Sequence, residues 1–335
     1  MVKTIDVHTH LYPKPWMDYL EKANGPVIMK RTGPTSAVFY VRGGGVSAIT
    51  MPGHYDLDSR MEDFDKCGID IQILSLTTPG VEFLPDKDGV EWARRINDYF
   101  ADVRTRYPGR YFAHASLPYQ DIDAALEELD RSYKQLGIKG ITMFSNIDGK
   151  PIASPEFFPI YKKAEEYGLP VFIHPGYPLI GEILEKQKIN KDLYGFAVDT
   201  SMAVLSLIWQ GILEKYPGLN IVHPHLGGII PYMTHRMEAC WKRQHEKLGL
   251  ELPMAPSEYY KRQVYPDSNP CNSAQMRCCL DYVGPEHICL GTDYAHSTGE
   301  WETAIKYIKD LGLSEKDTNN ILGGNAAIIY KIEEP

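Results

Sequence analysis

The chain has 335 residues, which is enough for one large α/β domain or two medium ones, and its 43% hydrophobic content is ordinary for a globular protein. Its net charge of −9 argues against nucleic acid as the main partner, because phosphate binding favours a basic surface, but it leaves a small anionic substrate open. The first 20 residues lack the features of a signal peptide and no run of 18 apolar residues suggests a membrane segment, so we expect a soluble, cytoplasmic protein.

Short apolar, β-branched runs alternate along the chain with segments of helical period. Helices are expected at 88–106, 121–136, 154–167 and 273–282. Asp121 and Ser154 are plausible N-caps, and Gly137 and Gly168 stand where a left-handed cap is needed. The predicted strands, in chain order, are Ile5–His10, Ile69–Leu76, Tyr111–Leu117, Ile138–Phe144, Pro170–His174, Leu219–His225, Arg262–Asp267 and His287–Asp293.

Eight strands that alternate with helices predict a parallel sheet, and eight is the number that closes a (β/α)8 TIM barrel. The main competitor is a doubly wound open sheet. No GxGxxG follows the first strand, which removes support for a dinucleotide-binding version of that fold. Residues 12–56 break the alternation with prolines, glycines and short alternating runs. We interpret them as an insertion with small antiparallel strands, placed where it would overhang the carboxyl ends of the barrel strands.

Histidines and aspartates occur at the ends of several predicted strands. His8 and His10 are two residues apart in the first strand and therefore point to the same side. His174 ends the fifth strand and Asp293 the eighth, so three imidazoles and a carboxylate can converge at one edge of the barrel. Such a set suits Zn²⁺, with Mn²⁺ as an alternative. Each residue alone is more often a packing or capping residue, and the prediction depends on their coincidence at strand ends.

The remaining histidines divide into two groups. His223 and His225 end the sixth strand and His296 follows the eighth, so these three are near the predicted centre. The others lack such a placement and are expected to be surface or core residues, namely His54, His114, His235, His245 and His287.

Several motifs together resemble a known family over nearly the whole chain. They are "IDVHTHLYP", "RRINDYFADVRTRYPGR", "VFIHPG", "VHPHLGG", "LGTDY" and the terminal "GNAAIIYKI". This set resembles the amidohydrolase superfamily, and within it the branch of metal-dependent decarboxylases similar to 2-amino-3-carboxymuconate 6-semialdehyde decarboxylase (amidohydrolase 2). The resemblance implies a single domain over 1–335, a distorted barrel with a small inserted β region after the first strand.

The resemblance also implies roles for individual residues. His8, His10, His174 and Asp293 match the metal ligands, and His225 matches a histidine beside a metal-bound water, where it would act as acid and base. No lysine at a strand end matches the residue that bridges two metals in binuclear members, so we expect one divalent ion, Zn²⁺ first and Mn²⁺ second, and no organic cofactor. His223 matches no ligand and is expected to be a supporting or packing residue.

Two arginines resemble substrate-binding residues of the branch. Arg42 lies in the insertion, and Arg236 matches a residue that reaches the active site of a neighbouring subunit, which requires a homodimer. A guanidinium suits a carboxylate because it binds through two parallel hydrogen bonds. A surface salt bridge is nearly as good an interpretation for each. Met237, Cys240 and Trp241 form an apolar helical face near Arg236 that could pack against a partner or against the barrel.

The activity implied by the resemblance is non-oxidative decarboxylation of an aromatic or unsaturated, muconate-like acid. Asp293 or His225 would deliver a proton to the carbon that carries the carboxylate. Hydrolysis or hydration by the same site is the alternative reaction, and a non-catalytic barrel that keeps a metal is the alternative class. Ala295 stands where the decarboxylases commonly have proline, which puts the identity of the substrate in doubt more than metal binding.

Overall fold

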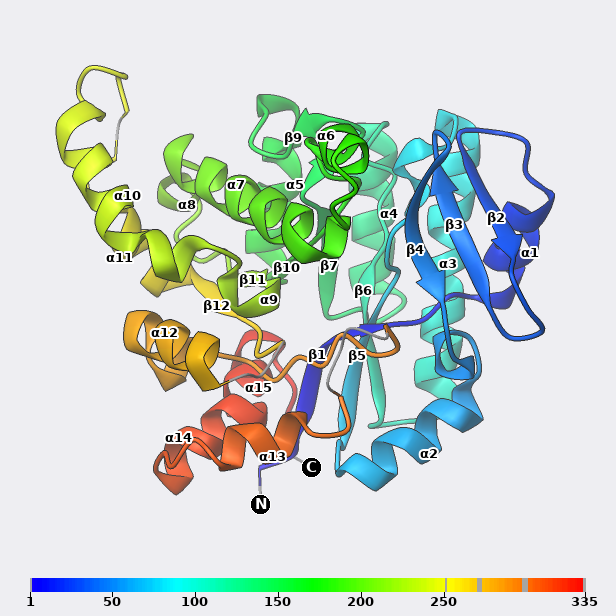
Figure 1. The fold of residues 1–335 in the computed structure, drawn as a ribbon. Helices are drawn as coiled ribbons and strands as arrows, with labels where there is room; N and C mark the ends of the chain where they lie inside the picture. Colours follow the sequence, from blue (N-terminus) through cyan, green and yellow to red (C-terminus); the bar gives the residue numbers. More distant parts are fainter. Residues whose placement is uncertain (1, 251, 270–272, 297–300, 334–335) are drawn as a thin grey trace.

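The fold is described by a computed structural model that covers residues 2–250, 252–269, 273–296 and 301–333. Its centre is a parallel sheet of seven strands, arranged in space in the order β1-β5-β6-β7-β10-β11-β12. Figure 1 shows the helices packed around this sheet. The strands are β1 Ile5–His10, β5 Ile71–Ser75, β6 Tyr111–Ala115, β7 Gly140–Phe144, β10 Val171–His174, β11 Ile221–His223 and β12 Val264–Pro266. The first seven predicted strands are therefore confirmed, six of them one or two residues shorter at one or both ends.

The eighth predicted strand is wrong in its bounds. His287 ends a 3-10 helix, η5 (Pro285–His287), and the chain that follows forms only isolated parallel bridges, Asp267 with Cys289 and Thr9 with Tyr294. These two bridges join the segment 288–294 to β12 on one side and to β1 on the other. The curled sheet is thereby closed into a distorted barrel, as predicted.

Asp6 explains why this last segment does not form a regular ladder. Its buried carboxylate accepts hydrogen bonds from the backbone N–H of Thr292 at 3.1 Å and from the Thr292 hydroxyl at 2.6 Å. A backbone donor that is bonded to a side chain is lost to the strand ladder. The segment keeps other backbone bonds to β1, including Asp293 N–H to the carbonyl oxygen of His8 at 2.8 Å.

The insertion predicted at 12–56 contains the expected antiparallel sheet. Its strands are β2 Val27–Arg31, β3 Ala37–Val41 and β4 Gly44–Ile49, and the 3-10 helix η1 (Pro52–His54) follows them. The sequence reasoning missed the helix α1 (Lys14–Lys22), which buries Trp16 against Trp92 of the barrel's outer helices. Figure 1 shows α1 and this small sheet together on one side of the barrel.

The predicted helices are all present. They correspond to α3 Asp86–Arg106, α4 Ile122–Lys134, α5 Phe158–Tyr167 with a preceding 3-10 turn, and α12 Ser273–Val283. The other helices are α2 Leu57–Cys67, α6 Gly181–Lys186, α7 Phe196–Trp209, α8 Ile212–Lys215, α9 Pro224–Gly227, α10 Ile230–Gln244, α11 Pro256–Gln263, α13 Ala304–Lys309, α14 Glu315–Asn319 and α15 Asn325–Ile329. In the described ranges, none of them has both the length and the apolar character needed to cross a membrane.

The predicted caps are confirmed at three positions of four. Asp121 accepts a hydrogen bond from the backbone N–H of Ala124 at 3.0 Å, as an N-cap should. Gly137 and Gly168 have the left-handed φ values of 65° and 62°. Ser154 precedes the 3-10 turn before α5 but its side chain makes no capping hydrogen bond, so its prediction as a side-chain cap is wrong.

The interior of the barrel is filled below the strand ends. Val7, Ile73, Phe172 and Val222 are buried together, and Tyr330, next to α15, packs against them. The ring of His8 lies 4.9 Å from that of Phe172, at the top of this layer. Side chains at the carboxyl ends of the strands therefore rest on a packed floor, and the space above them is open to ligands.

Candidate metal centre

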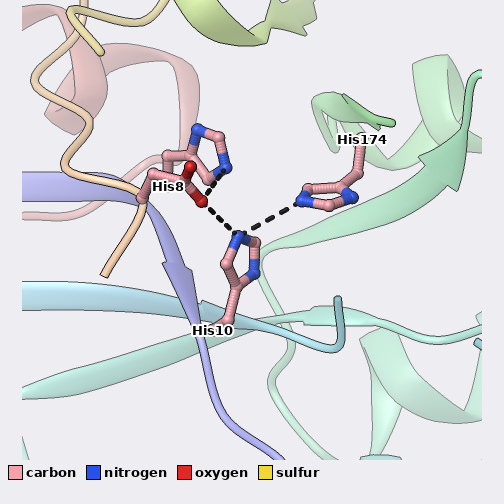
Figure 2. Close-up of side chains that lie close together, drawn as sticks. His8, His10 and His174 are labelled. Carbon is pink, nitrogen blue, oxygen red and sulfur yellow. Dashed lines mark hydrogen bonds and ion pairs between the residues drawn. The ribbon is translucent and has the colours of Figure 1, made fainter. Parts of the chain in front are cut away.

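The four predicted metal ligands meet at the carboxyl ends of the strands. β1 supplies His8 and His10, β10 ends with His174, and Asp293 follows the segment that closes the barrel. One nitrogen or oxygen of each lies within 4.8 Å of the others, and all four residues are buried. Figure 2 shows the three imidazoles directed toward one another. Among the residues that the structure describes, these four form the group whose ligand atoms lie close enough together to hold a metal ion. A single metal site is therefore indicated.

The closest contacts in this group involve the Nε2 atoms of the histidines. Nε2 of His8 lies 3.2 Å and Nε2 of His10 lies 3.1 Å from Oδ1 of Asp293. Nε2 of His174 lies 3.2 Å from Nε2 of His10. Three imidazole nitrogens and one carboxylate oxygen thus share one small space, which is a donor set typical of divalent zinc and manganese sites.

The tautomers of His8 and His174 are determined by their outer partners. Nδ1 of His8 lies 2.6 Å from Oδ2 of Asp267, and Nδ1 of His174 lies 2.9 Å from the carbonyl oxygen of Pro175. Ionised carboxylate and carbonyl oxygens only accept hydrogen bonds, so each Nδ1 carries the proton in the neutral ring. The Nε2 lone pairs of both rings are then free for a cation.

His10 is oriented in the same way through a hydroxyl group. Its Nδ1 lies 3.0 Å from Oγ of Ser75, and that hydroxyl donates to the carbonyl oxygen of Thr9 at 3.1 Å. Because the Ser75 proton is used on Thr9, the serine oxygen accepts from Nδ1–H of His10. All three rings therefore present Nε2 to the centre, and the residues fit a metal ion.

The charges around the centre favour a cation. Burial acts against a charge on His8, but the carboxylates of Asp293 and Asp267 outweigh it and raise the pKa of His8 to about 10. Burial would raise the pKa of Asp293, yet the positive charge of a protonated His8 and the contacts with the rings of His10 and His225 hold that pKa well below its usual range. The two carboxylates beside His8 thus favour a positive charge at this position, which a bound metal ion would supply in place of a proton.

His225 lies beside the four ligands but not at a strand end. β11 ends at His223, and His225 belongs to the turn-like α9 with a left-handed φ of 57°. Its Nε2 lies 3.7 Å from Oδ2 of Asp293, and its backbone N–H donates to Oδ1 of Asp267 at 3.0 Å. The prediction that the sixth strand extends to His225 is wrong, although the residue does reach the predicted centre.

The expectation that His223 and His225 share a face fails for the same reason. The left-handed turn separates their directions: His223 is fully buried, with Nδ1 2.9 Å from the hydroxyl of Tyr260, whereas His225 faces a cavity. Burial lowers the pKa of His223 to about 3, so the ring is neutral. His223 is thus a packing residue, one of the two roles expected for it.

A cavity of about 720 Å³ opens above the centre. Its inner wall carries His174, His225, Asp293 and His296, and its outer wall carries residues of the inserted sheet and of the segment 185–197, among them Ser47, Asn190, Lys191 and Phe196. Polar and apolar groups both contribute to the lining. The volume is in the range that holds a small organic ligand.

His296 and His54 form a polar chain that the sequence reasoning missed. Nδ1 of His296 lies 3.3 Å from Nε2 of His54, and Nε2 of His296 lies 3.3 Å from Oγ1 of Thr77, which also lines the cavity. His54 is buried, as expected for a core residue. In addition to packing in the interior, it contacts the cavity residue His296. Its position in the insertion carried no signal of this contact, because the two histidines are 242 positions apart.

The two arginines predicted to bind substrate do not line this cavity. The Arg42 side chain is 64% exposed and its guanidinium donates to Asp148 at 2.7 Å. Arg236 is exposed on α10, where Met237 is buried and Trp241 packs against the core, so the apolar face of this helix covers the barrel. Among the described residues that line the cavity, Lys188 and Lys191 are the basic side chains other than histidine, and there is no arginine.

Comparisons with known proteins agree with this geometry. The family model described as amidohydrolase matches residues 5–332. The chain is 31% identical to a 2-amino-3-carboxymuconate-6-semialdehyde decarboxylase from Dictyostelium discoideum, over 96% of this chain and 90% of the relative.

Solved structures show the same fold. The crystal structure of 5-carboxyvanillate decarboxylase from Sphingomonas paucimobilis superposes with a TM-score of 0.88 at 24% identity, covering 99% of this chain and 100% of that one. A 5-carboxyvanillate decarboxylase from Novosphingobium aromaticivorans, complexed with manganese and a nitrobenzoic acid, has a TM-score of 0.83 at 24% identity, covering 98% of this chain and 96% of that one.

Proposed function

The chain belongs to the amidohydrolase family, and from this membership and the geometry of its centre we propose that it is a metal-dependent, non-oxidative decarboxylase of an aromatic or unsaturated carboxylic acid. One observation carries the proposal: three imidazoles in the metal-binding tautomer and Asp293 converge at the bottom of a ligand-sized cavity, with His225 beside them. Each relative compared above is a decarboxylase by name.

Zn²⁺ is the proposed ion, and Mn²⁺ is the second candidate. The donor set of three imidazole nitrogens and one carboxylate suits both. A structural neighbour that is complexed with manganese supports the second. When bound, the ion supplies positive charge that attracts the oxygens of an acidic substrate. His8, His10, His174 and Asp293 would hold it.

His225 and Asp293 are placed to move the proton. The His225 side chain is 19% exposed toward the cavity, and its Nε2 lies 3.7 Å from Asp293. We expect His225, with Asp293, to deliver a proton to the ring or alkene carbon that bears the carboxylate. The new C–H bond makes that carbon tetrahedral, the C–C bond to the carboxylate then breaks, and its electrons restore the conjugated system as CO2 leaves. An imidazole can donate and recover a proton near neutral pH.

Hydrolysis or hydration by the same residues is the alternative reaction. A histidine and an aspartate that face a cavity can also remove a proton from water. The products discriminate: decarboxylation releases CO2, whereas the alternative adds one water to the substrate. The decisive experiment is metal analysis of the purified protein together with a panel of aromatic and muconate-like acids monitored for CO2. A protein that binds no metal, or that converts every active acid without CO2 release, would contradict the proposed function.

We also propose that the protein is a homodimer. Large apolar side chains are exposed just before α6, on α6, on the π-helix η4 (Lys191–Gly195), on α7 and on α10. Both α6 and α7 contact η4. These side chains are Leu179, Ile183, Leu193, Tyr194, Met202 and Tyr232. Exposed apolar groups in such number favour burial against a second copy.

Arg236 lies on the same α10 as Tyr232, so a dimer through this surface would bring Arg236 close to the partner, in the trans role expected for it. Arg42 would have to leave Asp148 to reach a substrate. Sedimentation showing only monomer would remove both the dimer and the trans role of Arg236.

A cytoplasmic location is proposed from the thiols. The cysteines of the described ranges, Cys67, Cys240, Cys278, Cys279 and Cys289, are free. Free thiols are typical of a reducing compartment. Cell fractionation with an antibody against the protein checks the location.

A further inference from the structure

Lys191 is the buried cation of the cavity. It begins η4, lines the same cavity as His174 and Asp293, and its side chain is only 9% exposed. The other lysine among the described lining residues, Lys188, is exposed. A lysine removed from water at a ligand cavity needs an anionic partner, because an unpaired buried charge is costly.

The partner of Lys191 is the carboxylate of Glu185, which also lines the cavity. The ammonium group of Lys191 donates to Glu185 and, at 3.0 Å, to the carbonyl oxygen of Gly45 in β4. It lies 5.1 Å above the ring of Tyr177, whose hydroxyl is 3.5 Å from Oε1 of Glu185. Lys191 and the Tyr177 hydroxyl therefore contact this carboxylate, and the Gly45 carbonyl holds the ammonium group in place.

A glycine leaves the space for that carboxylate. A Cβ atom added to Gly44 would lie only 2.8 Å from Oε1 of Glu185 and 3.2 Å from the ring of Tyr177. Most side chains at position 44 would therefore displace the carboxylate. The inserted sheet thus forms one wall of a cradle for a carboxylate at the outer side of the cavity.

The two charged residues differ in how firmly they are held. Lys191 is buried, whereas the Glu185 side chain is 42% exposed and stands on α6, a helix of only six residues. A half-exposed glutamate can turn to water, and the cost of leaving the buried Lys191 unpaired is avoided only where another carboxylate takes its place. Lys191 would then be available to another carboxylate.

We propose that Lys191 binds a second carboxylate of the substrate and that Glu185 occupies this place until the substrate displaces it. The inference rests on the proposed function and assigns to one residue of this chain the selection of acids that carry a second carboxylate. One carboxylate lies at the metal centre and leaves as CO2, and the other stays on Lys191. Glu185 is an internal competitor for the site, and Lys191 is a specificity-determining residue.

The proposal makes opposite predictions for the two members of the pair. Calorimetry measures the affinities of the metal-loaded protein for benzoate, isophthalate and terephthalate in the Lys191→Met and Glu185→Ala variants. The controls are Lys186→Met and Glu182→Ala, at an exposed lysine and an exposed glutamate that do not line the cavity. At least one dicarboxylate should bind the wild type more tightly than benzoate does. Lys191→Met should weaken that dicarboxylate roughly tenfold, equal to about 1.4 kcal/mol, and leave benzoate unchanged. Glu185→Ala should tighten it several-fold.

If Lys191 and Glu185 form a purely structural ion pair, the result is different. The loss of either partner would then disturb the wall of the cavity and weaken the binding of every ligand. Weaker dicarboxylate binding in Glu185→Ala, or a dicarboxylate-to-benzoate ratio that is the same in Lys191→Met and the wild type, would overturn the proposal. Thermal unfolding of each variant shows whether it is folded, and Glu185→Ala, at a half-exposed position, tests the proposal even where Lys191→Met does not fold. The CO2 assay of the wild type is independent of these affinities, so failure of the proposed function would be seen separately.

Discussion

The carboxylate of Asp267 lies 2.6 Å from Nδ1 of His8, and both side chains are fully buried. The same carboxylate accepts the backbone N–H groups of His225 and Asn269, each at 3.0 Å. Asp267 therefore orients a candidate metal ligand and holds the turn that carries the proposed acid. A carboxylate behind a histidine ligand also increases the basicity of its free nitrogen.

Replacing Asp267 by asparagine should lower metal affinity roughly 10- to 100-fold, because the buried charge behind His8 is lost while the shape is kept. Competition with a chelating dye measures the change. Ser75→Ala provides the comparison, since it removes a neutral hydrogen-bond partner of His10, and its effect should be smaller. Equal affinities for the wild type and Asp267→Asn would show that Asp267 does not support the ligand.

The His225→Ala variant should retain the metal and lose turnover. His225 is outside the group of four ligands and faces the cavity, so its loss should reduce kcat by roughly 10²- to 10⁴-fold, the usual contribution of an acid–base residue. Metal content and CO2 release are measured on the same preparation. His235→Ala, at an exposed position on α10, is the control. A His225→Ala protein that is fully active would leave only Asp293 as the proton donor.

Arg60 connects η1 of the insertion to β1, the strand that carries His8 and His10. Its buried guanidinium donates to the carbonyl oxygens of His10 at 2.6 Å and Gly53 at 2.8 Å, and to Oε1 of Gln72 at 2.8 Å. Arg60→Lys should lower the free energy of unfolding by about 3 kcal/mol, because an ammonium group cannot reproduce this planar set of bonds. Urea denaturation measures the loss. Arg95→Lys, at a half-exposed position, should change stability by less than about 0.5 kcal/mol.

Glu82 should make the protein less stable as the pH rises. Its carboxyl group is buried, and burial raises its pKa from 4.5 to about 8. Between these two values the folded state keeps a proton that the unfolded state has released, so the free energy of unfolding falls as pH increases.

Glu82→Gln removes this titration. The free energy of unfolding of Glu82→Gln minus that of the wild type should increase by about 1.4 kcal/mol for each unit that the pH rises within that window. Urea denaturation at pH 5 and pH 7.5 measures this difference. The same substitution at the exposed Glu91 should leave the difference constant. A constant difference for Glu82→Gln as well would show that the carboxyl group ionises in the folded state.

The group of four candidate metal ligands could be predicted because its signals are local. His8 and His10 share a side of β1 by the alternation of a strand, and His174 and Asp293 follow apolar runs that form the barrel. The carboxyl ends of parallel strands meet at one edge, so the convergence followed from the fold class. His225 reached the centre by another route than predicted, through a left-handed turn beyond β11.

The residues that surround the centre carried no comparable signal. His8 and Asp267 are 259 positions apart, and Lys191 is 146 positions from Gly45. Arg42 resembled a substrate-binding residue, yet its guanidinium pairs with Asp148 outside the cavity.

The sequence by itself therefore determined the alternation of the seven parallel strands with helices, the barrel class and the set of candidate metal ligands, because periodicity and strand ends are properties of short segments. Only the tertiary structure decided the tautomers of the histidines, the closure of the barrel by an irregular segment and the pairing of Lys191 with Glu185. Those features depend on which side chains come together when the barrel closes. The spacing of two residues along the chain does not determine the distance between them in the folded protein.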